Sequence, residues 1–150
     1  MISIGVERVS DIIETELWPL LEDHREELTT NKGLMVLAPD VPKYRAMEQA
    51  GVFVGLIARD AGRIVGYSGN LMSQHLHYCA LRYASNDVLF LAKEYRRGTL
   101  GLKLMRATES EMRARGCKVM VWHAKPGTTL DELMPKLGAR VQDILYTREL

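Results

Sequence analysis

One segment in the middle of the chain constrains the fold more than any other. An apolar run at 88–92 (VLFLA) is followed by a turn at 93–99 (KEYRRGT) and then by an amphipathic helix that ends at Gly116. The run is short and apolar enough to be a buried strand. The apolar side of the helix consists of Leu104, Met105, Thr108 and Met112. A strand that leads into a helix in this way indicates an α/β arrangement.

The turn itself predicts an anion-binding site. The first N–H groups of a helix have no partners within the helix and point toward one place. Gly98 and Gly101 let the backbone approach a ligand closely, and Arg96 and Arg97 add positive charge. The two arginines could also be solvated turn residues, but positive side chains oppose the dipole at a helix N-terminus, which favours a bound anion. A diphosphate has the right size.

The rest of the chain alternates between strands and helices. Strands are predicted at 2–8, 52–59, 63–73, 118–124 and 139–149, and helices at 11–28, 43–50 and 128–137. Pro19 splits or kinks the first helix near Trp18. The turn at Asp60-Ala61-Gly62 joins its two flanking strands as a hairpin. Residues 74–85 are either a loop or an extension of a strand.

Size and charge limit the possible functions. With 150 residues, 47% of them hydrophobic, residues 1–150 are expected to form one domain. Lys and Arg number 20 against 19 Asp and Glu, which argues against a nucleic-acid or membrane partner. Cys79 and Cys117 lack metal-ligand spacing and are expected to be free thiols. The N-terminus resembles neither a secretory signal nor a membrane span, so we expect a cytoplasmic protein.

Residues 91–104 (LAKEYRRGTLGLKL) resemble the acetyl-CoA pyrophosphate motif of the GNAT superfamily of N-acetyltransferases, and the order of elements agrees along the whole chain. Shorter stretches are similar to a phage-type subgroup: 24–27 (HREE), 39–40 (PD), 75–78 (HLHY) and 86–88 (NDV). The resemblance implies an α/β (α+β) fold, a central mixed, mostly antiparallel sheet of six to seven strands with helices on both faces. The parallel strands 88–92 and 118–124 would splay apart to form the acetyl-CoA cleft.

The resemblance implies an enzyme that moves an acetyl group from acetyl-CoA to a primary amine of a protein, peptide or small molecule, by direct attack in a ternary complex. It assigns cofactor binding to Leu91, Ala92, Lys93, Arg96, Arg97, Gly98, Thr99, Leu100 and Gly101. The Leu91 amide would meet the developing negative charge. Counted from Arg96, Thr99 stands where the family has its first glycine, and Gly98 is expected to compensate.

Two residues are candidates for proton transfer. A free alkyl amine has a pKa of about 10, so a group must take its proton. Asp87 lies four residues before Leu91, a spacing similar to that of the catalytic glutamate in histone-type members. Alternatively, Asp87 is a turn residue at the strand entry. Met134 stands where many members have their acidic tyrosine, so Tyr146 is the candidate acid, or else an ordinary sheet tyrosine.

The acceptor pocket is expected to include His24, Glu27, His77 and Tyr78, although ordinary core or surface hydrogen bonding would also explain each of them. The same histidines have loose spacing, and no metal site is predicted. His123 is a weaker candidate for carrying a proton. Because Met134 replaces the tyrosine that many members use as the acid, a second function stays open. The chain would then be a catalytically weak or inactive CoA-binding module that acts through a protein partner. The resemblance to the family also implies a homodimer.

Overall fold

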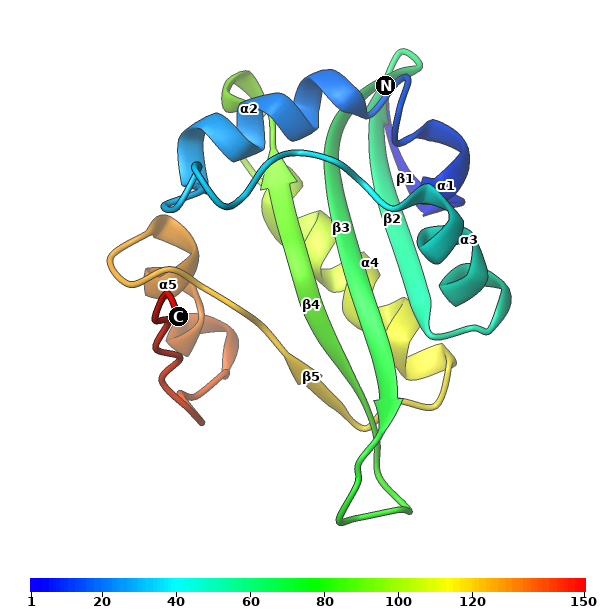
Figure 1. Cartoon of the computed structure of the whole chain (residues 1–150), viewed down its shortest axis with the longest axis vertical. Coiled ribbons are helices and arrows are strands. Elements are labelled where there is room, and N and C mark those ends of the chain that lie inside the picture. The colour runs from blue at the N-terminus through cyan, green and yellow to red at the C-terminus, as the bar shows by residue number, and fades with distance from the viewer.

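A computed structural model describes all 150 residues. Its centre is a five-stranded mixed sheet in the order β1-β2-β3-β4-β5 (Figure 1). Strands β1 to β4 pair antiparallel in succession, and β5 is parallel to β4. The strands are β1 (Ile2–Glu7), β2 (Phe53–Asp60), β3 (Arg63–Gln74), β4 (Arg82–Leu91) and β5 (Val119–Val121). The predicted mixed, mostly antiparallel sheet is therefore confirmed.

Helices cover both faces of the sheet, as predicted (Figure 1). On one face lie α1 (Val9–Ile12), α2 (Trp18–Leu28) and α3 (Val41–Gln49), and on the other lies α4 (Leu100–Ala114). The chain ends with α5 (Thr129–Leu133), and short 3-10 turns occur at η1 (Lys93–Tyr95) and η2 (Pro135–Leu137). Pro19 opens α2, so the predicted split of the first helix is confirmed.

Each face of the sheet has its own core. One cluster, which includes Ile13, Leu17, Ile57, Tyr67 and Phe90, packs between the sheet and the helices α1 to α3. A second cluster, which includes Val54, Leu56, Leu104 and Met112, packs between the sheet and α4. Leu104, Met105, Thr108 and Met112 are all buried, so the predicted apolar side of this helix is confirmed.

The β2–β3 hairpin has the predicted turn. Ala61 and Gly62 both have positive φ angles, of 47° and 88°. Two-residue turns with positive φ at both positions match the twist of the strands they join. Ala61 adopts a conformation that an L-residue with a Cβ rarely takes, so it carries local strain.

The C-terminal prediction was wrong. Residues 139–150 form no strand, and the N–H and C=O groups of 140–150 make no backbone hydrogen bond. Val141, Ile144, Leu145 and Tyr146 are 69–85% exposed. An alternating pattern needs a neighbouring strand to pair with, and β5 is only three residues long. The sheet accordingly has five strands and not six to seven.

Two further boundaries differ from the prediction. β4 begins at Arg82, so within the uncertain stretch 74–85 the residues 82–85 belong to a strand, Gln74 ends β3 and 75–81 is a loop. The first helix begins at Val9, where the Glu48 carboxylate accepts hydrogen bonds from the Val9 and Ser10 N–H groups at 2.6 and 3.3 Å. No helix is both long enough and apolar enough to cross a membrane.

Candidate active site

The second half of β4 has an open edge. β5 pairs with β4 only from Tyr83 to Ser85, and the chain beyond Val121 then turns away from the upper half of β4 (Figure 1). On the other edge, the Ala92 N–H donates to the Val65 carbonyl at 2.9 Å. Because backbone groups alternate in direction along an antiparallel pair, the N–H and C=O of Leu91 face the open edge. The predicted splay of the two parallel strands is present, and Leu91 offers a free N–H within it.

The turn after β4 presents a series of unpaired amides. The N–H groups of residues 97–102 donate to no protein group, and the first bond of α4 runs from the Lys103 N–H to the Thr99 carbonyl at 2.9 Å. Gly98 has a φ of 143°, a conformation that favours glycine. A Cβ at Gly101 would meet only the Leu91 Cδ1, at 3.3 Å. This combination of free amides and small residues at a helix N-terminus can hold a phosphate group.

A cavity of about 250 Å³ adjoins this turn. It is lined by Ile2, Ile4, Glu94, Tyr95, Arg97, Gly98, Thr99, Leu100 and Lys103. Arg97 and Lys103 form no ion pair with a carboxylate, so both cations are available to an anion. Charge and free amides thus coincide at the N-terminus of α4.

Arg96 behaves differently from its neighbour. Its guanidinium pairs with the Glu27 carboxylate through two contacts of 2.5 and 2.8 Å, and its Nε donates to the Leu91 carbonyl at 2.9 Å. It also lies over the Phe90 ring, 4.8 Å from the ring centre. Its hydrogen bond lowers the pKa of Glu27. Arg96 therefore ties α2 to the end of β4, and a contact with phosphate would require it to leave Glu27.

His24 of α2 and the buried Tyr67 of β3 form a hydrogen-bonded pair between the helix and the sheet. The His24 ring stacks on Phe90 with centroids 4.6 Å apart, and its Nδ1 is hydrogen-bonded to the Tyr67 hydroxyl. Burial lowers the pKa of His24, because the charged imidazolium loses its hydration. Burial also raises the pKa of Tyr67, with the negative charge of Asp87 contributing in the same direction. Both shifts favour the neutral forms of the two side chains.

Asp87 lies at a β-bulge inside β4. Gly69 pairs with Val88 and Asn70 pairs with Asn86, which leaves Asp87 as the extra residue. The alternative in which Asp87 is a turn residue at the strand entry was wrong, since β4 begins five residues earlier. Asp87 is exposed, and its charge also helps to raise the pKa of the half-buried Tyr44, mainly raised by burial. It therefore faces the α1–α3 side of the sheet.

The chain's similarity to known proteins agrees with this geometry. The profile of the Acetyltransferase (GNAT) family matches residues 17–138. This chain belongs to the GNAT acetyltransferase family. No curated protein sequence matches it, so the more specific comparisons are structural.

Several solved GNAT structures have the same fold. An aminoglycoside acetyltransferase from an uncultured soil metagenomic sample is 20% identical with a TM-score of 0.78, over 100% of this chain and 99% of that one. A ribosomal-protein-alanine N-acetyltransferase from Brucella melitensis biovar Abortus 2308 is 18% identical with a TM-score of 0.73, over 100% and 99%. AAC(6')-Iy in complex with the bisubstrate analog CoA-S-monomethyl-acetylneamine is 17% identical with a TM-score of 0.66, over 100% and 99%.

As a GNAT acetyltransferase, the chain is an N-acetyltransferase of a family that uses acetyl-CoA. The structure gathers the predicted cofactor residues, from Leu91 to Gly101, into one segment at the end of β4 and the start of α4. It also brings His24, Glu27 and Asp87 to the same face of the sheet. These three come from α2 and β4, which are far apart in the sequence.

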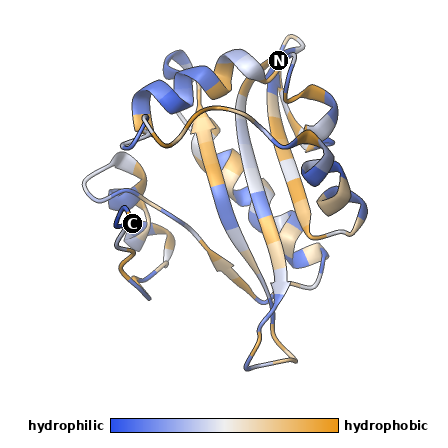
Figure 2. Ribbon diagram, in the orientation of Figure 1, coloured by the Kyte–Doolittle hydropathy of each residue, from blue (hydrophilic) through white to orange (hydrophobic).

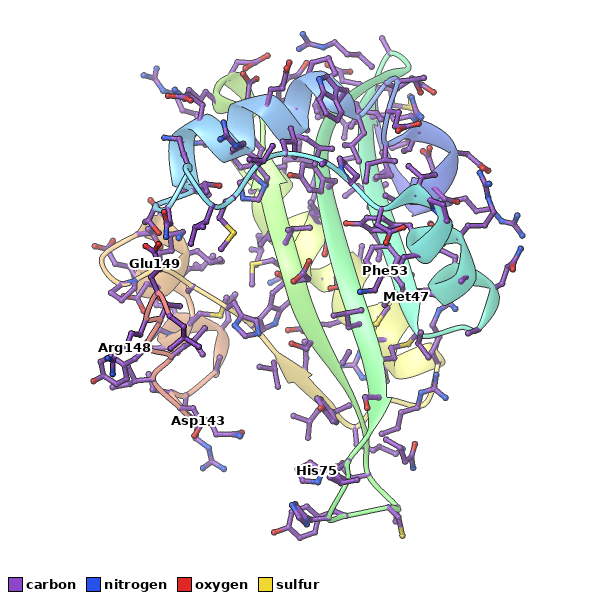
Figure 3. The ribbon with its side chains drawn as sticks, viewed as in Figure 1. Met47, Phe53, His75, Asp143, Arg148 and Glu149 are labelled. Carbon is purple, nitrogen blue, oxygen red and sulfur yellow. The ribbon has the colours of Figure 1, made fainter.

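Three other predicted residues lie apart from this group. His77 and Tyr78 lie in the β3–β4 loop, at the opposite end of β4 from Leu91, and Figure 3 shows their neighbour His75 at that tip. Tyr146 is 85% exposed in the irregular segment beside α5 (Figure 1). The β3–β4 loop precedes β4, so its residues lie a full strand length from Leu91. The spacing of these residues in the sequence could not show that distance.

The sequence did not identify some other residues near the site as functional candidates. Tyr67 and Tyr44 were interpreted only as parts of a strand and a helix, and no local pattern distinguishes them from core tyrosines. The Ser85 hydroxyl lies 3.1 Å from the His123 Nε2, next to the point where β5 leaves β4. His123 was a weaker candidate and stays one, since it lies two residues beyond the end of β5 at Val121.

Proposed function

We propose that this GNAT chain transfers the acetyl group of acetyl-CoA to a primary amine by direct attack in a ternary complex. The proposal depends on one observation above all: the open edge of β4 leads straight into the free amides of residues 97–102. A ligand with a diphosphate at one end and an extended arm fits that continuous path. The acetyl thioester, when bound, would supply an electrophilic carbonyl.

The cofactor side divides between two kinds of contact. The N–H groups at the start of α4, with Arg97 and Lys103, would hold the diphosphate. The Leu91 N–H would donate to a carbonyl oxygen that lies in the cleft. Ala92, Lys93 and Arg96 would line the path between these points, with Arg96 also holding Glu27 in place.

The acceptor side contains Asp87 as the proposed base. Asp87 is exposed on the α1–α3 face, where an amine could approach β4 without crossing α4. A carboxylate there can take the proton that an alkylammonium must lose before it attacks. Tyr146 is the proposed acid only if the C-terminal segment moves toward the cleft, and His77 and Tyr78 would reach an acceptor only if it extends along β4.

The lining of a second cavity favours a positively charged acceptor. This cavity of about 280 Å³ lies between α2 and the end of β4, and it is lined by Asp23, Glu26, Glu27, Phe90, Ala92, Lys93 and Glu94. Glu27, Glu94 and Glu26 already pair with Arg96, Arg63 and Lys32. Asp23 forms no ion pair, so it is the carboxylate that would attract a cationic amine. The structural neighbours named for aminoglycoside acceptors are consistent with such chemistry. A phage-type origin and a homodimer stay predictions from the sequence.

Titration calorimetry with acetyl-CoA, CoA and ATP tests the cofactor first. Saturable binding of acetyl-CoA and CoA without a response to ATP is the expected result, and the absence of acetyl-CoA binding would refute the proposal. Release of the CoA thiol with a panel of mono- and polyamines then tests transfer. Met134 on the helical turn where many members have a tyrosine favours the second candidate, an inactive CoA-binding module, and binding without transfer to any amine would support that candidate.

A further inference from the structure

Four polar side chains are buried together between the sheet and α4. Ser68 and Asn70 come from β3, Asn86 from β4 and Thr108 from α4, and each is at most 1% exposed. Figure 2 shows hydrophilic colour in the middle of β3 and β4. Buried polar groups are costly unless they are fully hydrogen-bonded, so a cluster of four in a small core requires an explanation.

The Asn86 amide is the centre of this cluster. Its Nδ2 is within hydrogen-bonding distance of four oxygens: Ser68 Oγ at 3.1 Å, Gly69 O at 3.2 Å, Asn70 Oδ1 at 2.9 Å and Val88 O at 2.9 Å. Thr108 is more peripheral, with its Oγ1 3.1 Å from Ser68 Oγ and 2.9 Å from the Leu104 carbonyl. The amide therefore contacts β4 on the far side of the bulge, whereas Thr108 does not.

This contact spans the extra residue of the bulge. Gly69 pairs with Val88, and Asn70 pairs with Asn86, so Asp87 lies between the residue that carries the amide and Val88, whose carbonyl accepts from that amide. A bulge bends its strand and increases the local twist. The β4–β5 ladder ends at Ser85, one residue before Asn86. The cleft thus opens at the position where the buried amide holds the bulge.

The bulge also decides which residues face the cofactor and which face the acceptor. Before it, Ala84 and Asn86 face α4, and after it Leu89 and Leu91 do so. The side-chain alternation has shifted by one residue, as it must when a strand contains one extra residue. Asp87 consequently lies on the α1–α3 face, where its charge helps to raise the pKa of the buried Tyr67, which burial raises most.

We propose that Asn86 is a positioning residue for acetyl transfer, acting through the bulge to hold Asp87 on the acceptor face. This inference rests on the proposed function, since it assumes that Asp87 takes the amine proton. Asn86 is fully buried and touches neither the acceptor nor the acetyl group. Its effect reaches the reaction through backbone geometry alone.

Three variants separate positioning from general destabilisation. Asn86→Ser and Asn86→Ala remove the bridge to Val88, whereas Thr108→Val removes a buried hydroxyl of the same cluster without touching the bulge. We expect at least a 10-fold lower kcat for both Asn86 variants, with the KM and the Kd for acetyl-CoA within threefold of wild type. We expect Thr108→Val to keep kcat within twofold. An equal loss of kcat in Thr108→Val, or an unchanged kcat in Asn86→Ser, would overturn the proposal.

A double-mutant cycle tests whether Asn86 acts through Asp87. If it does, the double variant Asn86→Ser/Asp87→Asn should be no slower than Asp87→Asn alone, within about twofold. Losses of kcat that multiply would show that Asn86 acts independently of Asp87, and this would overturn the proposal.

A failure of the proposed function is distinguishable from a failure of this inference. If the wild type binds acetyl-CoA but acetylates no amine, the proposed function fails, and amide hydrogen exchange in the full chain then tests the bulge. Faster exchange at Val88 and Phe90 in Asn86→Ser than in Thr108→Val would support the positioning of β4 by Asn86. Equal exchange in the two variants would overturn it.

Discussion

Replacing Gly101 with aspartate should weaken acetyl-CoA binding while leaving the protein at least as stable. Gly101 lies in the first turn of α4, among the free amides of residues 97–102. For the Coulomb estimate we take a separation of about 6 Å between such a carboxylate and a bound diphosphate. With an effective dielectric constant of roughly 20 to 40 and screening at physiological salt, the repulsion comes to about 1–3 kcal/mol, or roughly 5- to 150-fold in Kd. The same charge complements the helix dipole and should add about 0.3–1 kcal/mol of stability.

Gly101→Asn is the matched control, because asparagine has the same shape without the charge. In both variants the new Cβ meets the Leu91 Cδ1 at 3.3 Å, so steric effects cancel in the comparison. Calorimetry with acetyl-CoA at low and high salt should show a larger Kd for the aspartate variant, and the difference should shrink as salt is added. Equal Kd values for the two variants at low salt would refute an anion site at these amides.

Three further outcomes are expected. Asp87→Asn should leave the Kd for acetyl-CoA unchanged and lower kcat, more at neutral than at alkaline pH, because a free amine then needs no base; a pH-independent ratio to wild type would exclude Asp87 as the base. Ala61→Asn should raise the free energy of unfolding in urea by about 0.5–1 kcal/mol, since asparagine tolerates the positive φ of 47° better, and an unchanged midpoint would mean that the turn is not strained. Burial lowers the pKa of His24, so the unfolded chain takes up its proton first as pH falls below about 6.5; wild type should therefore lose more stability between pH 7.5 and 5.5 than His24→Gln, whereas parallel curves would contradict this.

The segment from 88 to 116 shows how far sequence could reach. A strand, a glycine turn and a helix are consecutive in the chain, so their local geometry follows from local residue preferences, and the free amides at the start of α4 follow from the helix itself. The cofactor half of the site was therefore predictable from one stretch. The acceptor half was not, because His24 on α2 and Asp87 on β4 come to the same side of the sheet only after the fold has formed.

The C-terminal segment shows the opposite case. Its alternation of apolar and polar residues favoured a strand at 139–149, but a strand also needs an edge with free backbone groups in the right register. The sequence does not show whether β5 has an edge long enough for a further strand to pair with. With three residues, β5 is too short for this. Tyr146, whose predicted place depended on that strand, is exposed as a result.

The misplaced start of β4 has a single physical cause. Ser85, Asn86 and Asp87 are polar and interrupt the alternation, and such residues between apolar runs usually mark a turn. In the structure they are polar because Asn86 is hydrogen-bonded inside the core and Asp87 is the extra residue of a bulge. An apolar residue at 86 would have made the strand easier to recognise, but it would have left the Gly69 and Val88 carbonyls without this donor. The residues that hid the strand in the sequence are thus the ones that bend it, and the bend is what separates β4 from β5 at the cleft.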